Sequence, residues 1–149
     1  TAKEDVNTLY KKFSENSYKS IIELLQKLEK GSLKLKKQRR TNKKAYTVLS
    51  EDECRIDWKK NAVQIFNKVR ALKAPYPQAY TILNEKKYFF NEAVMTNIKS
   101  QNKPGRIEKI VTNNLYINTK QNLLKVTEFY RDKKKINASK EFKAGDTFI

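Results

Sequence analysis

The segment 79-AYTILNEKKYFFNEAVM-95 contains two apolar runs separated by the short polar pair Asn84–Glu85. Tyr, Phe, Ile, Thr and Val favour the pleated backbone of a β-strand, whereas Asn favours a turn. Runs of this length and composition that are bounded by turn residues are typical of strands. The segment therefore predicts two strands, at residues 79–83 and 87–95.

Three further runs of the same kind follow this segment along the chain. They cover residues 106–111, 115–119 and 123–130, and the predicted turns between runs lie at 103–105, 113–114 and 121–122. Five short strands at a spacing of about ten residues are typical of small barrels of the OB type. We therefore expect an OB-like, five-stranded β-barrel.

Two stretches before the barrel have the spacing of a helix with one buried face. Apolar residues at positions i, i+3, i+4, i+7 and i+10 predict such a helix. One set is Tyr18, Ile21, Ile22, Leu25 and Leu28; the other is Ala62, Ile65, Phe66, Val69 and Leu72. A helical turn is also expected near 137–142, so the predicted fold class is α+β, with an N-terminal helical segment and a linker before the barrel.

The charge balance of the chain limits the possible functions. The 149 residues include 33 Lys and Arg against 16 Asp and Glu, which gives a formal net charge of +17, and they include no histidine. The missing imidazole removes the commonest general base and the commonest metal ligand. The single Cys54 excludes an internal disulfide and a multi-cysteine zinc site. No apolar stretch approaches the roughly 18 residues that span a bilayer, and the N-terminus has no signal-peptide pattern, so we expect a cytoplasmic protein without a membrane partner. The net charge of +17 predicts a polyanionic partner.

Residues 34–44 form the densest basic segment, which we call the basic arm. Its cations are Lys34, Lys36, Lys37, Arg39, Arg40, Lys43 and Lys44, and no acidic residue occurs between Lys30 and Glu51. A Lys or Arg that neutralises a phosphate releases counterions, so a series of them can follow a nucleic-acid backbone. The alternative is a solvated linker in a lysine-rich proteome. The segment has little helical periodicity, so we predict an extended structure that contacts phosphates.

A second basic cluster follows the last predicted strand. Arg131 is followed by Lys133, Lys134 and Lys135, directly after the aromatic pair Phe129–Tyr130. Basic side chains beside aromatic rings can hold a nucleic-acid strand, and we assign Lys133–Lys135 as further phosphate contacts. The alternative is a solvated hairpin loop.

The sequence offers few candidates for catalysis or metal binding. Its one acidic group is Glu51, Asp52, Glu53 and Asp57. Carboxylates at the start of an element usually stabilise a helix dipole, and we interpret them in that way. Cys54 has no histidine to activate it. The three glycines form no phosphate-binding loop. We therefore assign no catalytic residue and no metal ligand to this chain.

Several motifs resemble the C-terminal domain of the formyltransferase family. The string Arg55-Ile56-Asp57-Trp58, the following helix with Val69-Arg70-Ala71-Leu72, and Pro75-Tyr76-Pro77-Gln78-Ala79-Tyr80 resemble that family's I-D-W and I-R-A-x-x-P-x-P-G-A-[FY] signature. Residues 83–87 and 103–107 resemble its L-N-G-K-K and P-G-x-I segments. The resemblance implies structural roles for Asp57, Trp58, Arg70, Pro75, Tyr76 and Pro77.

The resemblance also implies what this chain lacks. The family's Asn, His and Asp catalytic residues and its 10-formyltetrahydrofolate site lie in a Rossmann-like half with no counterpart here. We therefore expect no bound cofactor and no activity from this chain alone. The implied organisation is residues 1–30 as terminal helices that pack on the missing catalytic domain, 31–55 as the basic linker, and 56–149 as the OB-like domain.

Three functions remain open at this point. We favour substrate positioning in a formyltransferase that acts on methionyl-tRNA. The family's glycine is replaced by Gln78, and residues 44–49 and 131–136 differ from the usual segments of the tRNA enzymes. These differences leave a nucleotide-linked amino sugar as the alternative acceptor. A free-standing OB-like RNA-binding module is the alternative from another class.

Overall fold

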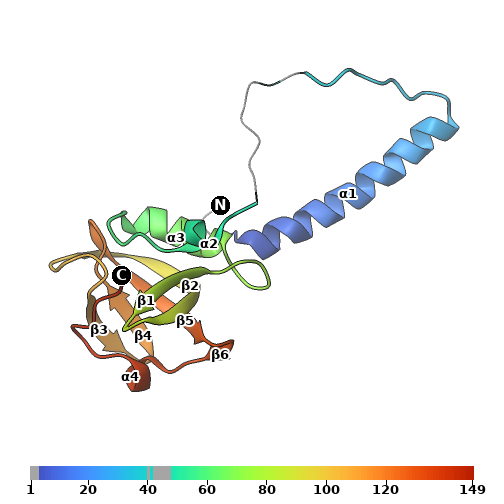
Figure 1. The fold of residues 1–149 in the computed structure, drawn as a ribbon. Helices are drawn as coiled ribbons and strands as arrows, with labels where there is room; N and C mark the ends of the chain where they lie inside the picture. The colour runs from blue at the N-terminus through green and yellow to red at the C-terminus, as the bar shows by residue number, and fades with distance from the viewer. Residues whose placement is uncertain (1–3, 40, 42–47) are drawn as a thin grey trace. The chain divides into compact units, whose positions relative to one another are not determined.

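The protein is described here by a computed structural model that covers residues 4–39, 41 and 48–149. The chain forms two compact units, Thr1–Val48 and Leu49–Ile149 (Figure 1). The first contains helix α1 (Val6–Glu29), and the second contains all the other helices and strands. Within the described residues, no helix is both long enough and apolar enough to cross a membrane.

Helix α1 begins and ends with standard capping interactions. The Asp5 carboxylate accepts a hydrogen bond from the Thr8 backbone N–H at 2.9 Å, and the Asp5 N–H donates to the Thr8 hydroxyl at 2.9 Å. These two bonds form a capping box that satisfies free N–H groups at the helix start. Gly31 follows the C-cap Lys30 with φ of +62°, as is usual after a helix end. The predicted helix is therefore present, but the face predicted to be buried is exposed in this structure, at Tyr18, Ile21, Ile22, Leu25 and Leu28.

The second unit combines short helices with one antiparallel sheet. Its elements are α2 (Glu51–Cys54), α3 (Ala62–Ala71), β1 (Ala79–Leu83), β2 (Lys86–Lys99), β3 (Ile107–Val111), β4 (Asn114–Ile117), β5 (Asn122–Arg131), β6 (Lys134–Lys135) and α4 (Ala138–Glu141). The strand order is β1-β2-β5-β4-β3, with β6 paired to β5. All five predicted strands are present, so the α+β class is confirmed. The two-residue strand β6 was not predicted.

Tight turns with left-handed backbone join three of the strand pairs. The central residues are Asn84–Glu85, Thr112–Asn113 and Asp132–Lys133, all with φ between +45° and +64°. Two consecutive residues of this kind form the hairpin turn whose twist matches the strands that flank it. The turn predicted at residues 113–114 is displaced by one residue, because Asn114 already begins β4 and pairs with Val111.

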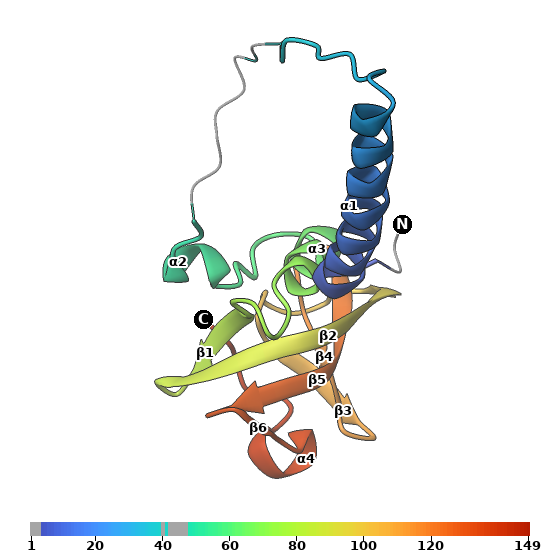
Figure 2. The same cartoon turned by 90° about the vertical axis from the view of Figure 1, so that its right-hand side faces the viewer.

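The sheet is open, whereas the sequence predicted an OB-like, five-stranded β-barrel. Strands β1 and β3 stand at the two ends of the strand order. The C-terminal tail lies against both of them. Its Phe148 N–H donates to the Gly105 carbonyl at 3.0 Å, just before β3, and its Ile149 N–H donates to the Ile82 carbonyl of β1 at 2.9 Å. Figure 2 shows the strong curvature of β2 and β5 in this sheet.

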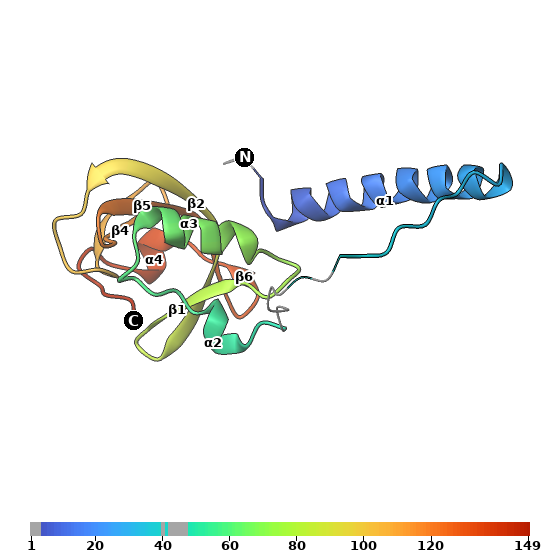
Figure 3. The same ribbon diagram turned by 90° about the horizontal axis from the view of Figure 1, so that it is seen from above.

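Helix α3 packs on β2 and β5, and Figure 3 shows it lying across them. Figures 1 and 2 place α4 at the opposite end of the sheet. The α3 residues Ala62, Ile65 and Val69 are buried, as the helical spacing predicted. Aromatic residues dominate the core that they enter: Trp58, Tyr88, Phe90, Phe129, Phe142 and Phe148 are at most 4% exposed.

Gly105 gives the first test of this fold. Its φ is +87°, and a Cβ atom there would lie 2.4 Å from the Phe148 carbonyl oxygen. We expect Gly105→Ala to lower the free energy of unfolding by about 3 kcal/mol, because it adds backbone strain and forces the tail away. Urea unfolding followed by the fluorescence of Trp58, the single tryptophan, measures this loss.

Gly31→Ala is the matched control for this substitution. Gly31 also has positive φ, but a Cβ atom there would meet no other atom within 4 Å, and the residue belongs to the other unit. The Trp58 unfolding transition should therefore stay unchanged. Equal transitions for wild type and Gly105→Ala would contradict the close contact between the tail and Gly105.

Candidate nucleic-acid interface

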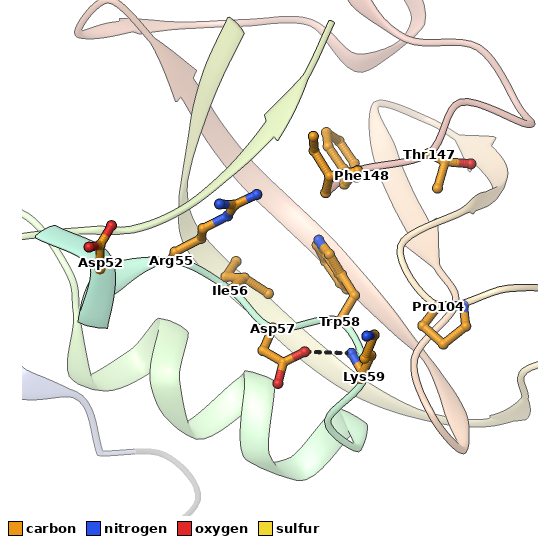
Figure 4. A pocket seen from close by; sticks show the side chains of 10 residues that line it. Asp52, Arg55, Ile56, Asp57, Trp58, Lys59, Pro104, Thr147 and Phe148 are labelled. Atoms are coloured by element: carbon orange, nitrogen blue, oxygen red, sulfur yellow. Dashed lines mark hydrogen bonds between the residues drawn. The ribbon is translucent and has the colours of Figure 1, made fainter. Parts of the chain in front are cut away.

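Trp58 stands at the centre of the second unit. Its indole N–H donates a hydrogen bond to the Thr81 hydroxyl at 2.9 Å, and both residues are buried. Its ring is stacked against that of Phe148, with 5.9 Å between ring centroids, as Figure 4 shows. A buried indole needs a partner for its one polar group, and Thr81 supplies it. The geometry therefore gives Trp58 a structural role.

The other motif residues lie at or near the surface. Asp57 is exposed and accepts a hydrogen bond from the Lys59 backbone N–H at 3.0 Å. Arg70 donates to the Asn67 side chain at 2.9 Å and lies 5.6 Å from the centre of the Phe66 ring. These contacts stabilise a turn and the end of α3.

The segment with Pro75, Tyr76 and Pro77 leads from α3 into β1. Pro75 and Pro77 are exposed, and Tyr76 is half-buried. The Tyr76 N–H donates to the Lys73 carbonyl at 3.0 Å, and the Ala74 N–H donates to the Asn91 side chain at 3.3 Å. This segment is therefore fastened to β2.

A hollow of about 530 Å³ lies beside Trp58 (Figure 4). Two cations, Arg55 and Lys59, and two acids, Asp52 and Asp57, belong to its lining. Their charges balance. The aromatic rings at the hollow, Trp58 and Phe148, are only 4% and 2% exposed, so they offer little surface on which a planar ligand could stack.

Three residues of the acidic group, Glu51, Asp52 and Glu53, form the short helix α2 together with Cys54, within the range that the sequence assigned to the linker. The Ser50 hydroxyl accepts from the Glu53 backbone N–H at 3.4 Å, and the Ser50 N–H donates to the Glu53 carboxylate at 2.8 Å. The bonds from Ser50 lower the pKa of Glu53. The acids therefore stabilise a helix start, as we interpreted them. Cys54 is buried.

The structure describes four of the seven cations of the basic arm. Lys34, Lys36, Lys37 and Arg39 are exposed and belong to no helix or strand. Arg40, Lys43 and Lys44 lie outside the described residues. The extended segment suits contacts to successive phosphates, and the role of the arm stays a prediction.

The second basic cluster is partly neutralised by acids. Lys135 forms an ion pair with Glu128 at 2.9 Å, and Arg131 forms one with Glu141. Lys133 lies in the turn and Lys134 in β6, and both are exposed. Two of the four cations in this hairpin are thus already paired, so it is a weaker candidate for phosphate contacts than the arm.

Glu128 organises this part of the sheet. Its carboxylate accepts hydrogen bonds from the Asn91 side chain at 2.6 Å, from Lys135 at 2.9 Å and from the Tyr130 hydroxyl at 3.0 Å. The bond from Asn91, followed by that from Lys135, lowers the pKa of Glu128 to about 2. Because Asn91 also accepts from Ala74, one network connects the Pro75–Pro77 segment with the β5–β6 hairpin.

Sequence reasoning missed a third group of cations, which the fold brings together. Lys59, Lys60, Lys99, Lys103 and Lys120 are far apart in the chain, and all are exposed. The backbone N–H of Lys120 donates to the carbonyl of Lys60 at 3.1 Å. No local pattern of residues signals such a group, because only the tertiary fold joins its segments.

Residues 48–147 match the family described as formyl transferase, C-terminal domain. This range is about two thirds of the chain, and the motif segments quoted above lie within it. The chain belongs to that family.

Proteins similar to this chain include methionyl-tRNA formyltransferases. The enzyme of Malacoplasma penetrans (strain HF-2) is 32% identical over 151 residues, which cover 97% of this chain and 47% of that protein. The enzyme of Thermodesulfovibrio yellowstonii is 33% identical over 144 residues, with 95% of this chain and 44% of that protein covered. The chain thus spans less than half the length of these curated relatives.

A solved structure with the same fold is HypX from Aquifex aeolicus in complex with tetrahydrofolic acid. The TM-score is 0.62 at 20% sequence identity, and the match covers 80% of this chain and 21% of that chain. At this identity the likeness concerns the fold alone.

The Glu128 network predicts how stability depends on pH. The folded state lowers the pKa of this carboxyl from its ordinary value of 4.5 to about 2. Its contribution is therefore fully present above pH 4.5 and is lost as the pH falls toward 2. For a side chain that is 18% exposed, we expect a loss of about 2 kcal/mol over this range. Urea unfolding at a series of pH values measures it.

Glu128→Gln should remove most of this dependence, because the amide does not titrate. Glu92→Gln on β2 is the matched control, since Glu92 pairs with Lys73 at a side chain that is 54% exposed, and it should keep the wild-type profile. A Glu128→Gln profile parallel to that of wild type would show that the network does not hold this carboxylate ionised.

Proposed function

We propose that this chain is the substrate-positioning part of a 10-formyltetrahydrofolate-dependent formyltransferase that acts on methionyl-tRNA. Its membership of the formyl transferase C-terminal family carries the proposal, together with relatives that are methionyl-tRNA formyltransferases. The net charge of +17 and the exposed arm supply the attraction for a polyanionic acceptor.

The role of this part is to hold the acceptor rather than to react with it. Formyl transfer joins the carbonyl carbon of the donor to an amino nitrogen of the acceptor, so the two groups must meet in one geometry. Fixing that geometry accelerates the reaction by removing orientational freedom. Phosphate contacts along the arm, at Lys34, Lys36, Lys37 and Arg39, would fix the acceptor while leaving its aminoacyl end free.

The hollow beside Trp58 does not fit the folate cofactor. A pterin needs an accessible flat surface or convergent polar groups, and the hollow beside Trp58 has neither: its two rings are buried against each other and its four charges balance. We therefore assign the cofactor to the portion of the relatives that this chain does not span, and we derive no step through it here.

The first unit fits the proposed division of the enzyme. Helix α1 exposes large apolar side chains, for example Phe13 at 68% and Leu28 at 59%. Burying such a face usually requires a neighbouring structure. We infer that residues 1–30 pack on a catalytic domain of the same enzyme. Residues 31–55 would be the linker, whose last residues, from Leu49 on, fold with the acceptor-binding domain of residues 56–149. We place the whole enzyme in the cytoplasm.

We also infer that the sheet acts as an OB-like barrel. The tail supports this, because Asp146 and Phe148 bond to the start of β3 while Ile149 bonds to Ile82 of β1. The C-terminal tail thus connects the open edges of the sheet, at β1 and β3, although it is not itself a full strand. A sheet whose end strands are both bonded to the tail would give the domain a rigid outer surface for the acceptor.

The binding part of the proposal predicts a steep dependence on salt. Fluorescence anisotropy with an unmodified initiator-tRNA transcript at several salt concentrations should show log affinity falling linearly with log salt concentration. The variant Lys34→Gln/Lys36→Gln/Lys37→Gln should reduce the slope by about 2, since each phosphate contact contributes roughly 0.7–0.9.

The matched control for the arm is Lys11→Gln/Lys12→Gln/Lys19→Gln. It removes the same charge from α1, whose three lysines are also exposed, and we expect it to keep most of the slope. Absence of tRNA binding at low salt, or binding without a salt slope, would refute the proposed function.

A further inference from the structure

The linker joins the sheet unit through a single turn of helix. Val48, the last residue of the first unit, is 94% exposed, and helix α2 begins soon after it, at Glu51. A helix of 4 residues has too few internal hydrogen bonds to persist by itself in water. The helical form of α2 therefore depends on contacts with the rest of the sheet unit.

The end of this turn is fixed to β1 and α3. The Ile56 N–H donates to the Tyr80 carbonyl of β1 at 2.7 Å, and the Lys68 side chain of α3 donates to the Arg55 carbonyl at 2.6 Å. The Ile56 side chain is buried in the core. The chain from Arg55 onward is thus fastened to the sheet unit by backbone bonds and by packing.

The start of the turn is held by two smaller contacts. The side chain of Cys54 enters the core, and Glu51 forms an ion pair with Lys87 of β2, whose ammonium lies 4.3 Å from the centre of the Tyr80 ring. The Glu51 and Lys87 side chains are 73% and 36% exposed, and ion pairs at such exposure stabilise a structure only weakly. The start of α2 is therefore held less firmly than its end.

Release of these two contacts has a defined effect on the linker. Segments with few buried contacts open locally at a low cost in free energy. Once α2 leaves the sheet unit it loses its helix, together with the capping box between Ser50 and Glu53. Residues 49–54 then join the preceding linker, and each adds roughly 3.3–3.6 Å of reach.

We propose that α2 is a releasable anchor of the linker, which the Glu51–Lys87 ion pair and the buried Cys54 side chain hold closed. In the closed state the linker ends at Val48. In the open state it extends to Arg55, where the bonds to α3 and β1 stop the release. The anchor thus gives the linker two lengths, and it needs no ligand to do so.

Cys54, the single cysteine of the chain, reports the open state. Its thiol is buried in the closed anchor, so it reacts with a neutral reagent such as iodoacetamide only after release. The variant Glu51→Gln/Lys87→Gln removes the ion pair and keeps the net charge of the chain. We expect its Cys54 to react about fivefold faster than that of wild type.

The matched control is Asp52→Asn/Lys86→Gln, which changes the neighbouring residues of the same two elements and the same charges. Both residues are exposed, and neither forms an ion pair within the part of the chain that the structure describes. This variant should react at the wild-type rate. Lys87→Arg should also react at that rate within about twofold, because it preserves the positive charge.

The dependence on urea separates local release from global unfolding. Local release exposes little surface, so the reaction rate of Cys54 should stay constant at urea concentrations well below the unfolding transition. The transition itself is followed by the fluorescence of Trp58 in the same samples, which shows that each variant is folded.

Faster reaction in Glu51→Gln/Lys87→Gln alone, at a rate that low urea does not change, supports the anchor. Equal rates in this variant and in wild type, or equal acceleration by the control, would overturn it. A rate that rises with urea from the lowest concentrations would also overturn it, because Cys54 would then be exposed only by global unfolding. These measurements need no RNA, so their outcome is independent of the proposed function.

Discussion

The contact of Trp58 with the C-terminal tail is the interaction on which the rest of the second unit depends. The indole stacks on Phe148 and donates its N–H to Thr81 of β1. Gly105 permits this arrangement, because any Cβ atom there would collide with the Phe148 carbonyl. Four distant segments therefore meet at one ring system. The tail thereby connects the two end strands of the sheet. It also holds the loop that contains the exposed residue Lys103.

Pairing with acids determines which basic residues are available to a partner. The total of +17 does not identify a surface by itself. In the β5–β6 hairpin, Glu128 and Glu141 engage Lys135 and Arg131, and their bonds serve the stability of the sheet. No such pairs within the described residues involve Lys59, Lys60, Lys99, Lys103 and Lys120. The described cations of the arm are exposed and belong to no helix or strand. The acids of the sheet thus pair with some cations and leave others exposed.

The sequence predicted the elements of the fold well because the signals for them are local. Each of the five strands lies within a few residues of its predicted range, and α3 buries the predicted face. The turn at Thr112–Asn113 was placed one residue too late, because Thr is an unusual residue for left-handed backbone. Strand β6 was missed because two residues carry no periodicity. The neighbourhood of Lys60 and Lys120 could not be predicted, since their segments are joined only by a long-range backbone hydrogen bond.

The sequence by itself determined the class of fold, the family and the absence of a histidine-based active site, because composition, periodicity and short motifs depend only on neighbouring residues. The tertiary structure decided the rest. It showed that the sheet is open with a tail between its end strands, that Trp58 is a structural residue, and that five lysines share one end of the sheet. These features depend on contacts between residues dozens of positions apart, and such contacts exist only once the chain has folded.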